Sequence, residues 1–125
     1  MSAEKAEKQD ISGRYEATFG VLPPSVAARM ALSEAAGRSA ATEAIENLRG
    51  VLLAKNALGA KVQQLVHFAQ LLALGAKEPA RLHAAAAARA GATLEELVGV
   101  AETSLITAGM PAYAMAMELI GEVVA

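Results

Sequence analysis

Glycine and proline divide this chain into segments of helical length. Between these breaks no alternation of apolar and polar residues persists, and β-branched residues are scattered. A half-buried strand needs such an alternation, whereas apolar residues three and four positions apart form one face of a helix. The sequence therefore predicts an all-α fold, a single-domain bundle of about six to seven helices.

The same breaks predict how the domain is organised. Residues 1–9 form a polar N-terminal leader, and residues 10–125 form one helical domain, because no long linker or internal repeat divides them. The prolines of "VLPPS" suit a turn followed by the first turn of a helix. Thr93 and Glu96 have the spacing of a capping box, which begins another helix. The expected helices end near Gly20 and Gly37, span 39–53, 60–74 and 79–91, and then begin near 94 and after Pro111.

Composition limits the classes of partner. A net charge of −2 without a basic cluster argues against nucleic acid. The absence of cysteine excludes disulfides, thiolate metal sites and a thiol redox cycle within this chain. The longest apolar stretches, 62–74 and 105–124, are interrupted by polar residues or proline, so no membrane span is expected. The charged N-terminus lacks the apolar core of a signal peptide, which predicts a cytoplasmic location.

The apolar content predicts self-association. Hydrophobic residues make up 54% of the chain, aromatic residues only 3% and charged residues 19%, below the ~25% of ordinary soluble domains. A small domain has too much surface to hide so many apolar side chains by itself. We therefore expect a homo-oligomer.

The segment 60–74 carries an uncharged polar stripe. On a helical wheel, Gln63, His67 and Gln70 share this stripe and Gln64 flanks it. A stripe facing bulk water usually carries Lys or Glu, so this one predicts a partly enclosed surface, either a subunit interface or a pocket wall. The expected apolar face consists of Val62, Leu65, Val66, Ala69, Leu72 and Ala73.

His83 directly precedes a run of five alanines, 84–88. No side chain of that run can satisfy its imidazole, so a partner must come from another segment. Arg81 lies about 200° away around the helix, which turns His83 inward if the arginine faces solvent. His83 would then share its face with small residues, Ala86 and Ala87 among them. Spacing alone is compatible with a core histidine bonded to a neighbouring helix or with a functional one.

The order and spacing of several motifs resemble the carboxymuconolactone decarboxylase family, which includes the alkylhydroperoxidase D-like proteins. The motifs are Gln64, Leu74-Gly75, His83, Gly91-Ala92-Thr93 and Gly109-Met110-Pro111, with "FGVLPPSV" upstream. The resemblance covers nearly the whole chain from about Tyr15. It implies a helical fold of the same family and assembly as a trimer or hexamer.

One branch of that family uses a cysteine pair, a histidine and a glutamate to reduce peroxides. The corresponding positions here are Ala76, Pro79, His83 and Gln64, so both sulfurs and the carboxylate are missing. Peroxide reduction needs a thiolate. We therefore expect no thiol peroxidase activity.

The other branch decarboxylates a small carboxylated lactone. The resemblance implies a carboxy-lyase-like activity without a cofactor, in which His83 donates or accepts a proton beside Gln64, and His67 and Lys61 bind the small-molecule ligand. A cysteine-less member that binds a ligand or partner without catalysis is the alternative hypothesis. A metal site on His67 and His83 is a third, although no third protein ligand is evident from the sequence.

Overall fold

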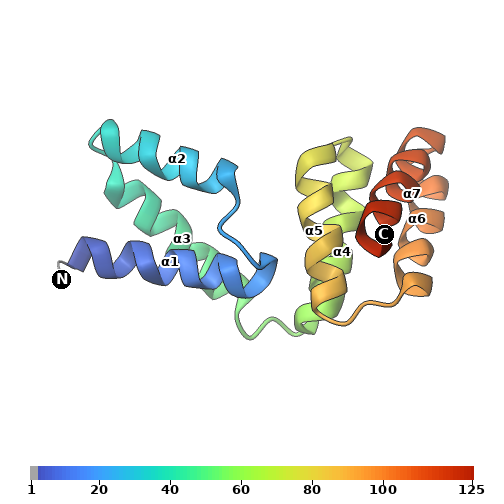
Figure 1. Ribbon diagram of the computed structural model, residues 1–125, viewed down its shortest axis with the longest axis horizontal. Helices are drawn as coiled ribbons and strands as arrows, with labels where there is room; N and C mark the ends of the chain where they lie inside the picture. The colour runs from blue at the N-terminus through green and yellow to red at the C-terminus, as the bar shows by residue number, and fades with distance from the viewer. Residues whose placement is uncertain (1–2) are drawn as a thin grey trace. The chain divides into compact units, whose positions relative to one another are not determined.

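The structure, a computed structural model, describes residues 3–125, with side chains described from residue 10 onward. Within that range all regular secondary structure is helical and no strand is present, which confirms the all-α prediction. Figure 1 shows the order of the helices. They are α1 (Ala3–Phe19), α2 (Pro24–Ala35), α3 (Ser39–Leu53), α4 (Gly59–Leu74), α5 (Lys77–Arg89), α6 (Leu94–Ala108) and α7 (Met110–Val124).

The helices group into two compact units, residues 1–56 with α1 to α3 and residues 57–125 with α4 to α7. The expected single domain over residues 10–125 stays a prediction. Part of the expected leader is helical, because α1 begins at Ala3. Residues 3–9 read "AEKAEKQ", and alanine, glutamate, lysine and glutamine all have high helix propensity. Residues 1 and 2 of the leader lie outside the described residues.

Local sequence signals fix the helix ends in the second unit. The predicted capping box is confirmed at the start of α6. The Thr93 hydroxyl accepts a hydrogen bond from the Glu96 backbone N–H at 3.1 Å, and the Glu96 carboxylate accepts one from the Thr93 N–H at 2.9 Å. At the end of α4, Gly75 has a left-handed φ of 71°, a conformation that glycine adopts without strain. α5 follows after only two residues.

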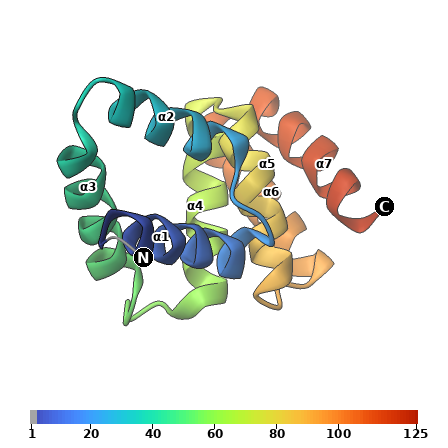
Figure 2. The same cartoon turned by 60° about the vertical axis from the view of Figure 1, so that its left-hand side comes forward.

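The core of the second unit forms around α4. Phe68 and Leu72 of α4 are fully or almost fully buried and pack with Leu97 of α6 and Leu119 of α7. α5 contributes small side chains to this core, namely Ala80, Ala84 and Ala87. Much of the alanine run therefore serves close packing. α4 and α5 lie side by side, as Figures 1 and 2 both show.

The buried face of α4 differs from the predicted one. Gln64, Phe68 and Leu72 are its buried residues, whereas Val62 and Val66 are 42% and 37% exposed. The prediction was right for Leu72, which is buried, and for Leu65, which packs against the core, but wrong for Val62 and Val66, because it assigned the face by counting aliphatic residues. The large Phe68 ring instead points into the core, and Gln64 and Leu72, each four positions from it, lie on the same buried face.

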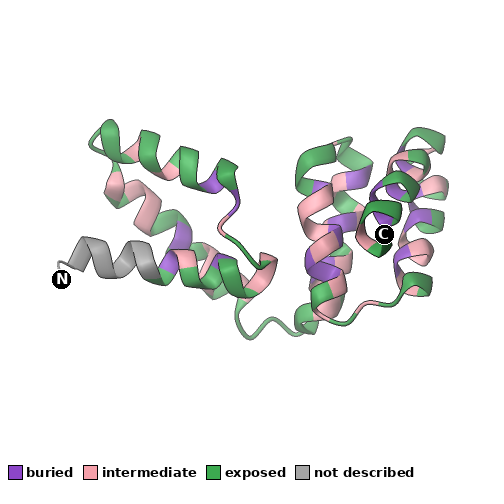
Figure 3. Cartoon of the chain, in the orientation of Figure 1, coloured by how far each residue is buried: buried purple, intermediate pink, exposed green. Residues whose placement is uncertain are grey.

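The first unit has a smaller core. Ile11 and Tyr15 of α1 pack with Val26 of α2, and Phe19, Leu22 and Met30 border them. Figure 3 shows exposed residues along much of α2 and α3, whereas buried ones recur along α4 to α7. Large apolar side chains on α3 are exposed, among them Leu48 at 58% and Val51 at 76%. Within the described residues, no helix is both long and apolar enough to cross a membrane.

Candidate functional site

The turn between α4 and α5 brings the two histidines together. The N–H of Ala76 donates to the carbonyl of Leu71 at 2.9 Å, which closes the end of α4 as Gly75 reverses the chain. His67 precedes Gly75 by eight residues and His83 follows it by eight. Two helices joined by so short a turn run back along each other, so these positions meet.

His83 finds its partner on the neighbouring helix, as its place before the alanine run required. Its Nδ1 lies 2.7 Å from Oε1 of Gln64. Gln64 is only 8% exposed, and the imidazole is partly buried. An amide oxygen can only accept, so Nδ1 carries the hydrogen of this bond. In the neutral ring the lone pair then lies on Nε2, the atom left to exchange a proton with a ligand.

His67 stacks on His83. The two ring centroids are 4.4 Å apart and the planes meet at 26°. The structure thus brings together three of the four residues that the sequence marked: Gln64, His67 and His83. Their contacts with a substrate remain a prediction.

Lys61, the fourth residue, is engaged in an ion pair. Its Nζ lies 3.0 Å from Oε2 of Glu96 on α6. The backbone N–H of Thr93 and the Lys61 ammonium together hold the pKa of Glu96 below its usual range. The described contacts of Lys61 therefore lead to Glu96, and its role in ligand binding stays a prediction.

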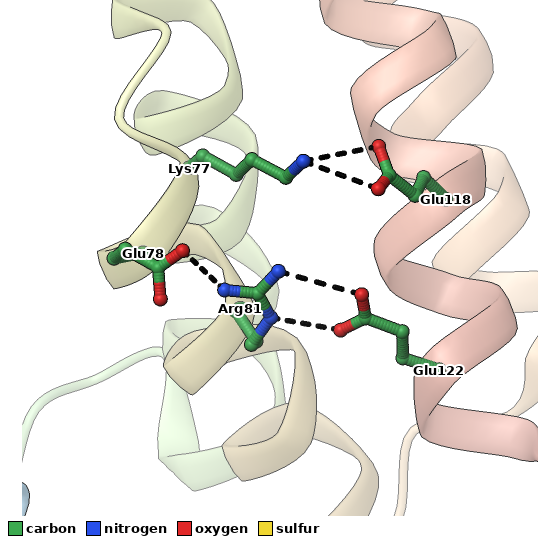
Figure 4. A network of polar contacts seen from close by, with 5 residues as sticks. All are labelled: Lys77, Glu78, Arg81, Glu118 and Glu122. Carbon is green, nitrogen blue, oxygen red and sulfur yellow. Dashed lines mark hydrogen bonds and ion pairs between the residues drawn. The ribbon is translucent and has the colours of Figure 1, made fainter.

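Two further cations of α5 pair with carboxylates of α7 (Figure 4). Lys77 Nζ lies 3.1 Å from Glu118, and Arg81 Nε lies 2.8 Å from Glu122. Arg81 also contacts Glu78 one turn earlier. Hydrogen bonds with Glu122 and Glu78 raise the pKa of Arg81, and the same bond to Arg81 lowers the pKa of Glu122. These cations tie α5 to α7.

The two positions that the resemblance matches to a cysteine pair lie at the start of α5. Ala76 is the residue before its first turn, and Pro79 lies within that turn. Neither carries a thiol, so the turn holds no group that peroxide could oxidise in the way a thiolate is oxidised.

A buried polar network in the first unit escaped the sequence analysis. Glu46 of α3 is 4% exposed and accepts a hydrogen bond from the Tyr15 hydroxyl at 2.9 Å. Arg29 contacts both groups, and Arg49 lies 3.5 Å from the same carboxylate. Burial, followed by the bond to Glu46, raises the pKa of Tyr15. A glutamate within a stretch of helix that also carries Glu43 gives no signal of burial, so only the fold reveals this network.

The metal hypothesis gains no further ligand. Among the described residues, no group of three or more histidine, cysteine, aspartate or glutamate side chains is placed to hold a metal ion. Two stacked rings also direct their nitrogens along their own planes, whereas metal ligands must converge on one point.

Comparison with known proteins identifies the family to which the chain belongs. The sequence profile of the carboxymuconolactone decarboxylase family matches residues 39–122, and the chain belongs to that family. An uncharacterized protein of Methanocaldococcus jannaschii is 35% identical over 81 residues, which are 65% of this chain and 76% of that protein.

A solved structure shares the fold. The crystal structure of a "putative carboxymuconolactone decarboxylase" from Burkholderia xenovorans LB400 superposes with a TM-score of 0.76 at 21% identity. The match covers 98% of this chain and 92% of that one. It confirms the predicted family fold.

Proposed function

We propose that this protein is a non-redox family member that uses His83 to transfer a proton to or from a small carboxylated lactone or a related acid. The observation that carries the proposal is the 2.7 Å contact between His83 Nδ1 and Gln64 Oε1. This contact orients the ring, and with the amide oxygen facing Nδ1 it favours the tautomer whose lone pair lies on Nε2. Orientation and tautomer are the two requirements for a positioned acid or base.

The proposed reaction is a decarboxylation. The bond between the carboxylate carbon and its neighbour breaks, carbon dioxide leaves, and the electron pair passes into the conjugated carbonyl system of the substrate. Protonated His83 then gives its Nε2 proton to the resulting carbanion, and the neutral imidazole regains a proton from water. The step consumes one proton and is neither an oxidation nor a reduction, which suits a chain without cysteine.

The test is turnover of small lactones and dicarboxylic acids, followed by carbon dioxide release. His83→Asn keeps a polar side chain but removes the titratable ring, and we expect it to lower kcat by about 10²-fold or more. Gln70→Ala on the exposed side of α4 is the matched control and should retain the wild-type rate. A folded His83→Asn variant that retains full activity would contradict the proposal.

Ligand binding without catalysis is the second candidate. It is favoured by the pairing of Lys61 with Glu96, of Lys77 with Glu118 and of Arg81 with Glu122, because a lyase of this type needs cations for its substrate's carboxylates. A ligand that raises the melting temperature of the protein but is recovered unchanged after long incubation would support this candidate.

A further inference from the structure

The stack of His67 on His83 places two titratable rings closer together than two positive charges tolerate. The centroids are 4.4 Å apart, far less than the Debye length of about 8 Å at physiological ionic strength, so salt screens little of their interaction. Both rings are partly buried, which lowers the effective dielectric below that of water. Protonating one ring therefore opposes protonating the other.

From this geometry we infer that His67 is a positioning residue for His83, and that the stacked pair takes up one proton well before the second as the pH falls. His67 acts in two ways. Its ring covers one face of the His83 ring, which Gln64 already holds at Nδ1. When His67 is neutral, His83 can hold the proton at Nε2 for donation; when His67 is charged, its field opposes that proton.

The charged side chains on the neighbouring helices do not outweigh the repulsion between the two protonated rings. Each nearby cation is matched by a carboxylate: Lys61 of α4 by Glu96 of α6, and Lys77 and Arg81 of α5 by Glu118 and Glu122 of α7. The fields of such pairs largely cancel at a distance. The other titratable side chains of these helices are Tyr113 and the exposed Glu78, Arg89, Glu95 and Glu102.

A single shared proton suits the proposed function, on which the catalytic part of this inference rests. Decarboxylation followed by protonation needs one proton at the site, delivered to carbon after carbon dioxide has left. A pair that holds one proton offers a donor and an acceptor at the same pH. A pair charged twice would have no base left.

Histidine titration followed by NMR tests the inference directly. The chain has only two histidines, so the full-length protein without an affinity tag gives two imidazole signals. We expect two protonation steps separated by about one to two pH units. In His67→Phe, which keeps a ring for stacking, and in His83→Phe, the remaining histidine should titrate in one step. That step should lie about one pH unit above the lower step of the wild type.

The result that would overturn the inference is independent titration. If both wild-type histidines titrate within about 0.3 pH units of their midpoints in the single-histidine variants, the rings do not share a proton. If one variant fails to fold, the midpoint of the remaining histidine in the other variant supplies the comparison. Because the titration needs no ligand, it also separates this inference from the proposed function, which fails only if His83→Asn leaves turnover unchanged.

Discussion

Replacing Gln64 by glutamate places a negative charge where the His83 imidazole now meets a neutral amide oxygen. The two atoms are 2.7 Å apart and Gln64 is 8% exposed. At an effective dielectric of about 20 to 40, opposite charges at this distance attract by roughly 3 to 6 kcal/mol. Burial of the new carboxylate offsets a large part of that attraction. We expect Gln64→Glu to raise the pKa of His83 by about one to two pH units relative to wild type.

The assay is the NMR titration of His83 in Gln64→Glu, compared with Gln64→Met. Methionine has a similar length but neither the charge nor the amide oxygen, so it should not raise the pKa of His83. The free energy of unfolding of Gln64→Glu, relative to Gln64→Met, should therefore be larger at acidic than at alkaline pH. The stabilisation from a raised histidine pKa is complete below the unfolded value of about 6.5 and is lost as the pH rises through the folded value. A His83 midpoint within about 0.3 pH units of wild type in Gln64→Glu would refute the reasoning.

Four other outcomes are expected. Thr93→Ala removes the capping hydroxyl of α6 and should cost about 1 kcal/mol in the free energy of unfolding, seen as a lower denaturant midpoint with an unchanged slope. Glu122→Gln should lower the melting temperature slightly at low salt. Because Arg81 lowers the pKa of Glu122, this difference is present above the unfolded pKa of about 4.3 and disappears as the pH falls through the lower folded value. The purified protein should reduce no peroxide with any thiol donor, and sustained turnover would contradict this. The protein should form a homo-oligomer that Met117→Lys weakens, whereas light scattering of a stable monomer at micromolar concentration would contradict assembly.

The fold was predictable because its signals are local. A capping box at Thr93 and a glycine at the end of α4 each act within a few residues, and each lies where the sequence placed it. The last helix begins slightly earlier than predicted, at Met110, so Pro111 lies in its first turn rather than before it. The face that α4 buries was not predictable in the same way. It depends on how Phe68 packs against residues of α6 and α7, which the sequence of α4 alone does not contain.

The candidate site was predictable only in part, for a similar reason. His83 stood out because its own segment could not satisfy it, and Gln64 because of the family resemblance. The stack of His67 on His83 depends on the register of two helices, which is set by a two-residue turn. The pairing of Lys61 with Glu96 depends on a third helix, so no pattern within α4 could show it.

The ion pair between Lys61 and Glu96 also bears on which features of a ligand the proposed site would recognise. Under the proposed function, a substrate carboxylate must first displace Glu96 from Lys61. Both side chains are substantially exposed, and exposed ion pairs contribute little to stability, so we expect this displacement to cost little. Gln64 cannot exchange in this way, because it is buried and would leave an unsatisfied amide in the core. The cations can therefore attract a range of acids without selecting among them. Under the proposed function, selection therefore belongs to the partly buried imidazole pair, and we expect a ligand to present to it a group that can exchange a proton with His83.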